Sequence, residues 1–562
     1  MATQPERGKS PGTRYLPLKI SIFGVLFGAI TACAHAAAVA PEATNLPAAS
    51  GAPAEELMKA EQPAQDAFDI WEFQVEGNTL LPGIDIERAV YGFLGEQKTI
   101  DTVTAAQQQL ESLYHARGYG SVYIDIPEQD VQAGVVRLKV TEAKVARTRV
   151  TGSRYFSLGR IKSKVPSLAA GSVPNLPKVQ EELAQLAQLS PDRVITPVLR
   201  PSRTPGKLEV ELKVKDELPV HGNMEFNDRY SADTTRLRLS ASVRYDNLWQ
   251  REHSIGASYQ LSPQDPTEVE VFVANYLWRF EDSPHLLALY AVKSNTDVAT
   301  IGTLGVLGSG TIVGARYTIP LKTVGTYFHS LNLGADYKDF DEQIGFQGSD
   351  AIVTPISYLM FSATYNGTWF HDKAVSHFNF ALNMAPRGLG NTQKEFERKR
   401  FKAIPNFVTV RATADHLQPL WRDFGLFTRL DLQAADVPLV NNESYSAGGV
   451  DTARGYIESE ALGDDAVALS AELRSPDLLH PRTLNWMNKL QLLAFTDTVL
   501  LNTKSPLPGL DPSQLLWSAG LGLRLTAVES LQATVFWAYP LLEGDRTPQG
   551  DDRFHFNVGY DF

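Results

Sequence analysis

The residue types that most often carry chemistry do not assemble into a catalytic motif in this sequence. Gly8-Lys9-Ser10 ends like a phosphate-binding loop but lacks its upstream glycine, and Val313 replaces the third glycine of a dinucleotide fingerprint beginning at Gly308. The histidines have no pair at the spacing of a zinc-binding helix, and Cys33 is the only cysteine. We therefore predict that the protein is not an enzyme, has no catalytic residues, and uses no metal or other cofactor.

The elements that dominate the C-terminal half are strands with alternating apolar and polar side chains. A strand places successive side chains on opposite faces, so this alternation gives one apolar face and one polar face. The last strand is the clearest case, and its apolar face consists of Phe554, Phe556, Val558, Tyr560 and Phe562. Apolar groups outside and polar groups inside are typical of a membrane β-barrel, and we interpret Phe562 as its C-terminal signal.

The same alternation recurs in residues 236–245, 254–261 and 518–527. These runs are close to the 9–11 residues with which a tilted strand crosses the hydrocarbon layer. An arginine on the lipid face near the midplane costs roughly 2–4 kcal/mol, so we expect the arginines of the first run to face the lumen. Alternation alone also fits a large soluble β-sandwich.

Composition favours the membrane barrel. The chain has 562 residues, of which 10% are aromatic, and a net charge of −12. Its mean hydropathy of −0.18 is too polar for a helical membrane protein but suits a barrel with a polar lumen. The acidity also argues against nucleic acid as a partner.

The N-terminus is typical of an export signal. Four basic residues precede the apolar run 20–32, and Ala34-His35-Ala36 offers a cleavage site, so we predict a signal peptide in residues 1–36. The alternative is a lipoprotein signal with Cys33 lipidated. Residues 37–67 are rich in Ala and Pro and are expected to form a linker, in which residues 55–61 could make a short plug helix.

Between the linker and the barrel the sequence predicts a repeat of about 75 residues. Residues 68–143 read as strand, two helices and two strands, and residues 144–218 repeat that order. Gly77 and Gly152 occupy equivalent turns of the two copies. The repeat predicts two small α+β (βααββ) modules, and the alternative is one α+β domain whose halves are similar by accident.

Several motifs resemble those of one family. In the first module they are Val75-Glu76-Gly77-Asn78-Thr79, Arg117-Gly118-Tyr119 and Ile126-Pro127-Glu128-Gln129-Asp130. In the barrel they are Gly448-Gly449, Ala453-Arg454-Gly455-Tyr456, Gly463-Asp464, Glu472-Leu473-Arg474-Ser475-Pro476 and Phe495-Thr496-Asp497. Together they resemble the TpsB outer-membrane transporters of two-partner (type V) secretion. Ala453 and Val499 depart from the family motifs, which have a branched aliphatic residue and a glycine there.

The resemblance implies a specific architecture and function. Residues 219–562 would form a 16-stranded transmembrane barrel in the outer membrane of a Gram-negative bacterium, behind two periplasmic POTRA (polypeptide-transport-associated) domains. The barrel would export a secreted TpsA exoprotein, unfolded, after the POTRA domains bind it by β-augmentation. Further expected partners are outer-membrane lipid and, during biogenesis, periplasmic chaperones and the barrel-assembly machinery.

The resemblance also implies the roles of individual residues. Arg454, at the tip of a long loop folded into the lumen, would pair with Asp497 on the wall beside Phe495, and Gly455 would permit close backbone approach or a positive φ at the tip. Two other functions stay open: an insertase of the same superfamily, which usually carries three or more POTRA modules, and a passive porin, which needs none.

Overall fold

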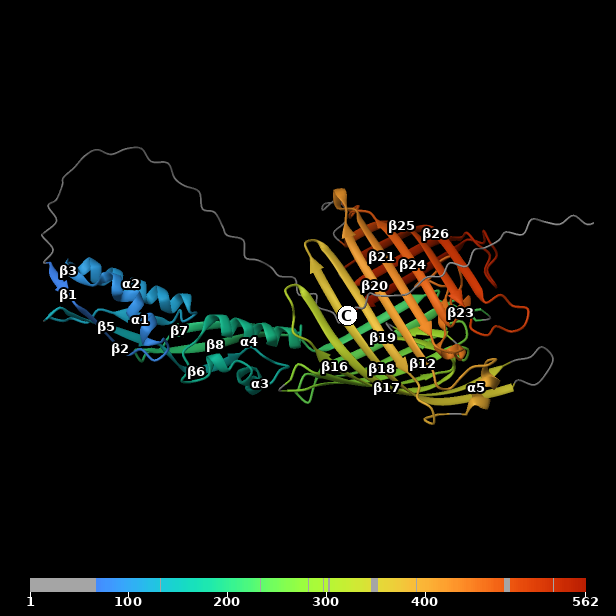
Figure 1. Cartoon of the computed structure of the whole chain (residues 1–562), viewed down its shortest axis with the longest axis horizontal. Helices are drawn as coiled ribbons and strands as arrows, with labels where there is room; N and C mark the ends of the chain where they lie inside the picture. The colour runs from blue at the N-terminus through green and yellow to red at the C-terminus, as the bar shows by residue number, and fades with distance from the viewer. Residues whose placement is uncertain are drawn as a thin grey trace, which may run out of the picture.

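The computed structural model describes residues 67–562, except residues 132, 233, 282, 297, 302–303, 345–351, 391, 480–485 and 529. The predicted signal peptide, the lipidation at Cys33 and the plug helix lie outside the described residues. Two small modules follow one another in a line and lead into a barrel (Figure 1). Within the described ranges, no helix is both long and apolar enough to cross a membrane.

The first module packs two helices on a three-stranded sheet with the strand order β2-β5-β4. Strand β5 pairs in parallel with β2 and antiparallel with β4. Its core contains the fully buried Ile70, Leu110, Tyr114 and Leu138. Its elements are β1 (Phe68–Ile70), β2 (Glu72–Glu76), α1 (Gly83–Val90), β3 (Gly95–Lys98), α2 (Ile100–Ala116), β4 (Val122–Asp125) and β5 (Val135–Glu142).

The second module repeats this arrangement with the strand order β6-β8-β7. Strand β8 pairs in parallel with β6 and antiparallel with β7, as β5 does with β2 and β4. The second helix expected in this copy is α4, at Leu176–Leu189. The elements are β6 (Lys144–Thr151), α3 (Leu158–Ser163), α4 (Leu176–Leu189), β7 (Arg193–Pro201) and β8 (Lys207–Asp216).

Sixteen strands then close into a barrel in which β28 pairs with β9. The four alternating runs noted in the sequence correspond to β10, β11, β26 and β28, and β9 is not among them, because its alternation is weak. The barrel strands are β9 (Val220–Asn227), β10 (Arg238–Leu248), β11 (His253–Leu261), β12 (Glu270–Arg279), β13 (Leu286–Ser294), β16 (Gly310–Pro320), β17 (Tyr327–Ile344), β18 (Ile352–His371), β19 (Ala374–Met384), β20 (Val408–Pro419), β21 (Gly425–Ala435), β24 (Asp465–Arg474), β25 (Met487–Asn502), β26 (Ser513–Ala527), β27 (Leu531–Pro540) and β28 (Arg553–Asp561).

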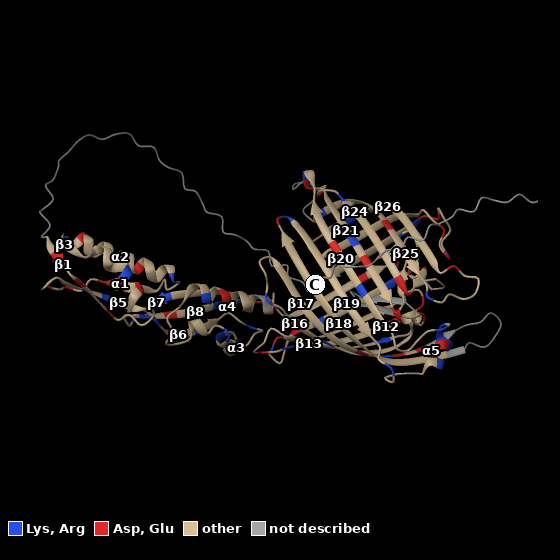
Figure 2. Cartoon of the chain, in the orientation of Figure 1, with Lys and Arg blue, Asp and Glu red and all other residues tan. Residues whose placement is uncertain are grey.

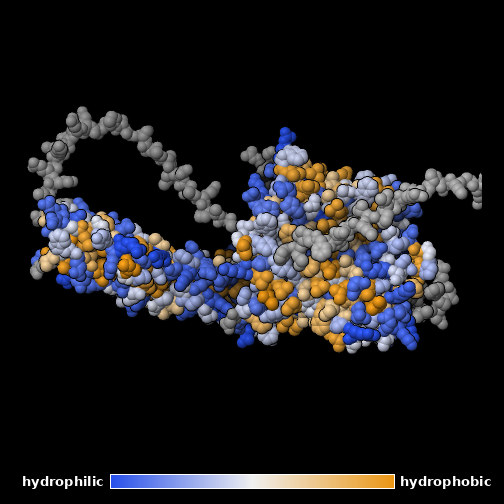
Figure 3. Space-filling model, in the orientation of Figure 1, coloured by the Kyte–Doolittle hydropathy of each residue, from blue (hydrophilic) through white to orange (hydrophobic). Residues whose placement is uncertain are grey.

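The barrel wall keeps the alternation expected from the sequence. On β10, Val243 is exposed, whereas Arg238 is buried and bonds to Thr234 and to backbone carbonyls beyond the strand end. Arg236 precedes β10. The expectation that the arginines of this run face the lumen therefore applies only to Arg238 and Arg244. Hydrophobic residues gather in patches on the visible face of the barrel, whereas the modules are mostly hydrophilic and carry charges of both signs (Figures 2 and 3).

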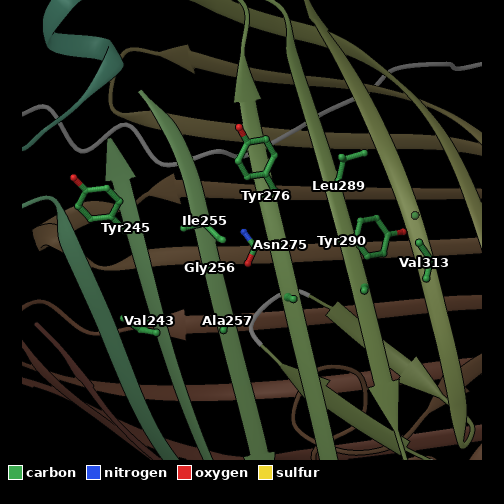
Figure 4. A pocket seen from close by; sticks show the side chains of 13 residues that line it. Val243, Tyr245, Ile255, Gly256, Ala257, Asn275, Tyr276, Leu289, Tyr290 and Val313 are labelled. Atoms are coloured by element: carbon green, nitrogen blue, oxygen red, sulfur yellow. The ribbon is translucent and has the colours of Figure 1, made fainter. Parts of the chain in front are cut away.

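A hollow of about 640 Å³ lies on the wall formed by β10 to β13 and β16 (Figure 4). It arises because three small side chains, Ala257, Ala274 and Ala291, are direct register partners on adjacent strands. Larger residues such as Leu289 and Val313 border it and are 43% and 51% exposed. The outer wall is therefore apolar but not smooth.

The seam between the last and first strands is short. β28 and β9 share five register pairs, from Asn557↔Asn227 to Asp561↔Asn223, whereas β9 and β10 share eight. Phe562 extends the seam, because its backbone exchanges two 2.9 Å hydrogen bonds with Gly222. A Cβ on Gly222 would meet the Phe562 ring at 2.1 Å, so the last side chain covers a position that only glycine leaves open.

Candidate functional site

Residues 436–464 join β21 to β24 and form a long loop, here called the barrel loop. It contains β22 (Tyr445–Ala447) and β23 (Ala461–Gly463), which pair antiparallel. We call residues 449–456 its tip, and residues 436–443 together with 460–464 its root. Both parts are largely buried against the barrel wall.

Arg454, at the tip, is held by Asp497 on β25. Its Nε donates to Asp497 Oδ2 at 2.8 Å and its Nη2 to Oδ1 at 2.6 Å, while its backbone N–H donates to Oδ2 at 3.1 Å. The side chains of Arg454 and Asp497 are 4% and 1% exposed. The structure therefore brings together the two charged residues that the resemblance pairs.

Glu472 on β24 is a second carboxylate at this guanidinium, and sequence reasoning assigned it no role. Arg454 Nη1 donates to Glu472 Oε1 at 2.7 Å, and Ser470 on the same strand bonds to both Arg454 and Asp497. Glu472 and Ser470 lie two residues apart, on the same face of β24. That periodicity could have placed the two side chains on one face of a strand, but only the register of β24 against β25 places them beside Asp497.

Two aromatic rings complete the enclosure of the guanidinium. The Arg454 Cζ lies 3.6 Å from the ring centroid of Phe495 and 5.0 Å from that of Phe536. A cation over a desolvated aromatic face gains about 2 kcal/mol. Removing one partner of a buried ion pair costs about 3–5 kcal/mol, because the other charge stays buried without compensation. Arg454 therefore holds the tip in the lumen strongly.

Gly455 and Tyr456 fix the backbone next to Arg454. A Cβ on Gly455 would lie 2.6 Å from Ser518 Cβ, and its φ lies outside the left-handed region, so close approach is what requires glycine there. The Tyr456 hydroxyl lies 2.8 Å from Leu542 O and 3.0 Å from Trp517 O. These contacts fasten the tip to the ends of β26 and β27.

The root is held by three other carboxylates. Asp464 accepts bonds from both Nη atoms of Arg400, which follows α5 (Gln393–Lys399), and from the N–H groups of Leu439 and Lys504. Glu443 accepts from Lys338 and Tyr358, both at 2.5 Å. Glu460 accepts from Arg546 N and Thr547 N at 2.6 and 2.9 Å. Asp464 belongs to a motif noted above. Sequence reasoning missed Glu443 and Glu460, because the partners named here are 85 to 105 positions away from them.

A cavity of about 260 Å³ adjoins the tip and is lined by charged groups that include Arg429, Arg474 and Arg524. About nine water molecules occupy that volume in liquid water. An extended chain needs about nine residues to cross a 30 Å hydrocarbon layer. This cavity is too small for such a segment.

The module motif residues Gly77 and Asn78 form the turn after β2. Gly77 has φ +86°, and a Cβ there would lie 2.4 Å from Val140 O; Gly152, at the matching turn, has φ +89° and would clash with Val214 O at 2.3 Å. Asn78 Oδ1 accepts from Leu81 N at 3.0 Å and from the Tyr114 hydroxyl at 2.6 Å. The two turns are geometrically equivalent.

A carboxylate at the end of the central strand caps each turn. Glu142 accepts from Thr79 N at 2.7 Å and Leu80 N at 3.0 Å, and Asp216 accepts from Arg154 N and Tyr155 N at 2.9 Å. Burial tends to raise the pKa of Asp216, but the N–H groups of Tyr155 and Arg154 and the Ser153 hydroxyl outweigh it and lower that pKa. The cap in the second module is therefore charged at neutral pH.

Gly118 and Tyr119 lie where the two modules meet. Gly118, with φ +92°, ends α2, and its carbonyl accepts a 2.8 Å bond from Leu176 N at the start of α4. Asn175 Nδ2 donates to Arg117 O at 2.9 Å. Tyr119 packs against the core of the first module. This motif thus connects the modules.

Pro127, Glu128, Gln129 and Asp130 lie in the connection between β4 and β5. The Gln129 side chain bonds to both Arg137 N (2.7 Å) and Arg137 O (2.8 Å), as a neighbouring strand would. The segment is thereby held against β5, away from the barrel-loop residues. In the described part of the chain, one group of three side chains could ligate a metal ion, and it lies at the joint between the second module and the barrel.

Two family models match the sequence. A model described as haemolysin secretion/activation protein ShlB/FhaC/HecB matches residues 206–525, which is more than half of the chain. A model described as POTRA domain, ShlB-type, matches residues 68–143. The first match covers most of the barrel, including the loop and β24 and β25.

The chain is similar to curated outer membrane transporters named CdiB. It is 23% identical to one from Dickeya dadantii (strain 3937) over 193 residues, which are 34% of this chain and 34% of the relative. It is 24% identical to one from Escherichia coli over 180 residues, which are 30% of that relative. The chain thus spans about a third of the length of the curated relatives it matches.

Solved structures share the fold over most of the chain. The CdiB structure from Escherichia coli has a TM-score of 0.57 at 19% identity and covers 91% of this chain and 93% of its own. A BamA from Haemophilus ducreyi lacking POTRA domains 1–3 has a TM-score of 0.56 at 15% identity, with 88% and 100% covered. At these identities the likeness concerns the fold alone.

Proposed function

The chain belongs to the ShlB/FhaC/HecB family of haemolysin secretion/activation proteins, the TpsB transporters, and on this premise we propose that it exports a secreted TpsA-type exoprotein across the outer membrane. The observation that carries the proposal is the family match over a closed 16-stranded barrel behind a POTRA domain. The barrel sits in the outer membrane of a Gram-negative bacterium, and the POTRA domain is in the periplasm. The exoprotein passes through the lumen unfolded.

The barrel loop is the gate of this pore in our proposal. Arg454, paired with Asp497 and Glu472, keeps the tip in the lumen beside a cavity of about 260 Å³. Passage of an extended polypeptide therefore requires the tip to leave. The root keeps its own contacts through Asp464, Glu443 and Glu460, so the loop stays attached while the tip moves.

We assign residues 144–218 as a second POTRA domain, residues 1–36 as a signal peptide, 37–67 as a linker and 219–562 as the barrel. The assignment of the second domain is supported by the repeated strand order and by the equivalent Gly77 and Gly152 turns. The apolar outer wall contacts lipid. Periplasmic chaperones and the barrel-assembly machinery assist its biogenesis.

The exoprotein docks as an added strand on the β4 edge of the first module. This edge has outward carbonyls that are held by side chains of α2: Ile124 O accepts from Gln107 at 3.0 Å, and His115 Nε2 lies 3.2 Å from Val122 O. Side chains that occupy backbone acceptors can be displaced by an extended peptide, which offers more bonds of the same kind. Glycine and proline do not interrupt β4, whereas β7, the matching edge of the second module, contains Pro197.

Mass spectrometry of culture medium and outer membranes from cells with and without this chain tests the function. We expect the loss of one large secreted protein from the medium, with the outer-membrane barrel proteins unchanged. A general loss of barrel proteins would instead indicate an insertase, and impaired uptake of small solutes with normal secretion would indicate a porin. A variant lacking residues 68–218 should likewise lose secretion while its barrel still inserts.

Photo-crosslinking tests the docking edge separately. A photoreactive residue in place of Gln107, beside β4, should crosslink to the exoprotein during export. The matched control is the exposed Gln74 on β2, the opposite edge of the same sheet. Crosslinks from Gln74 and not from Gln107 would contradict the edge assignment and leave the export function standing.

A further inference from the structure

Three potential metal ligands converge where the second module meets the barrel. Asp192 precedes β7 of the module, His221 is on β9, and Asp246 is on β10. His221 Nε2 lies 3.0 Å from Asp192 Oδ1 and 3.5 Å from Asp246 Oδ2. The three ligand atoms all lie within 4.8 Å of one another. This group, which we call the joint triad, plays no part in the loop site described above.

The Nε2 atom of His221 makes no hydrogen bond to the described residues. It is shielded from solvent, and both carboxylates are near it. The two oxygens therefore lie off the direction in which the ring nitrogen bonds. Tetrahedral zinc with bonds of about 2.0–2.1 Å sets its ligand atoms about 3.3 Å apart. The observed separations of 3.0 and 3.5 Å bracket that value.

Neighbouring groups hold the carboxylates in place. Ser190 Oγ donates to Asp192 Oδ2 at 3.1 Å and leaves Oδ1 facing the histidine. Arg244, the register partner of His221, donates to both oxygens of Asp246 at 2.8 and 2.9 Å. Contacts of this kind orient metal ligands in known sites.

Charge also fits a cation. The two carboxylates carry two negative charges, of which Arg244 compensates one. One nitrogen and two carboxylate oxygens, with a water as fourth ligand, is a donor set suited to zinc, whereas calcium and magnesium prefer all-oxygen sites.

We propose that Asp192, His221 and Asp246 bind a divalent transition-metal ion, zinc by its donor set, that ties the second module to the first two strands of the barrel. Other contacts cross the same joint, including Asn247 Nδ2 to Tyr155 O at 3.0 Å and Arg160 to Glu281 at 3.0 Å. The ion adds a tie that can be gained or lost with its concentration. It would stiffen the path from the docking edge to the pore mouth.

Zinc binding to the full-length mature chain tests the proposal. The protein, purified in detergent and freed of metal with EDTA, is titrated with Zn²⁺ by calorimetry, and bound metal is counted by mass spectrometry. We expect one zinc per chain and at least a ~100-fold weaker affinity for His221→Ala and for Asp246→Asn. His115→Ala, which removes a histidine that lies 4.0 Å from the single carboxylate Glu111, should bind like the wild type.

Equal zinc binding by the wild type and a folded His221→Ala variant would overturn the proposal. Heat-modifiable mobility on gels shows whether each variant has a folded barrel. A second measurement needs no variant: zinc should protect His221 from carbethoxylation by diethylpyrocarbonate in the wild-type chain, while His115 stays reactive. Equal modification of His221 with and without zinc would also overturn it.

Discussion

The tip and the root of the barrel loop are both buried and both charged, but they are anchored differently. At the tip, the bonds to Asp497, Glu472 and Ser470 all originate from Arg454. At the root, Glu443, Glu460 and Asp464 each have separate partners on different elements. The tip is also held by the Tyr456 hydroxyl and by Arg229, which bonds to Asp451, but Arg454 is its most deeply buried charged anchor, so freeing that one side chain releases the largest part of the tip's anchoring. The comparison therefore assigns the moving part to the tip and the fixed part to the root.

Removing the guanidinium of Arg454 should produce the largest difference between the tip and the root. Arg454→Ala leaves Asp497 and Glu472 buried without their partner, which costs about 3–5 kcal/mol. We expect the tip to leave the lumen and the conductance in planar bilayers to rise several-fold. Arg454→Lys keeps the charge but loses the paired bonds, and it should lie between the wild type and Arg454→Ala. An unchanged conductance in Arg454→Ala would count against a tip held by this residue.

Adding one carbon at Gly455 should act in the same direction with a smaller effect. The new Cβ would lie 2.6 Å from Ser518 Cβ, and such overpacking costs about 1–3 kcal/mol. We expect more frequent openings in single-channel recordings. The control is Gly425→Ala at the start of β21, where the nearest atom is 3.5 Å away. Openings that increase equally in both variants would point to a general loss of stability.

A substitution at the root should separate stability from gating. Arg400→Gln removes a bidentate partner of Asp464, but the N–H groups of Leu439 and Lys504 remain bonded to that carboxylate. We expect a stability loss of about 1–2 kcal/mol, measured by urea unfolding in detergent, with conductance close to the wild type. If Arg400→Gln opened the pore as much as Arg454→Ala, root and tip would be one mechanical unit.

Two hydroxyl deletions give the smallest and most closely matched test. Tyr456→Phe removes the tip contact to Leu542 O, and Tyr358→Phe removes a root contact to Glu443. Each should cost about 0.5–1.5 kcal/mol in unfolding free energy. Only Tyr456→Phe should raise the open probability. The reverse pattern would exchange the roles assigned to the two ends.

The parts of this structure that the sequence predicted are those with a local signal. Helix α4 was predicted from the repeated order of elements in the two modules, and β28 from its alternation. Strand β3 was missed because Gly95-Glu96-Gln97-Lys98 has no alternation and is a strand only through its pairing with β1. Strand β9 was missed for a similar reason, since closure of the barrel, and not its own pattern, fixes it.

The residues of the candidate site likewise divide into those that a sequence signal marks and those that only the fold brings together. Arg454 and Asp497 could be paired because a family motif marks both positions, while the residues themselves say nothing of their contact. Glu472 stands within a motif, yet only the register of β24 against β25 shows that it faces the same guanidinium. Arg400 and Asp464 are 64 residues apart and meet only because the loop after β19 folds over the barrel loop. Charge pairs between loops carry no periodic signal, so sequence patterns do not reveal them.

The position of the tip during export tests the central claim most directly. Spin labels at Asp451, on the exposed side of the tip, and at Arg251, in the turn after β10, can be placed in a Cys33→Ser background that has no other cysteine. Pulsed electron paramagnetic resonance then measures their separation in membranes with and without a stalled exoprotein. The account predicts that the separation of the two labels changes by about 10 Å or more when the pore is occupied. That change equals the length of about three strand residues, at about 3.3 Å each. An unchanged distance distribution while the exoprotein is in transit would contradict it.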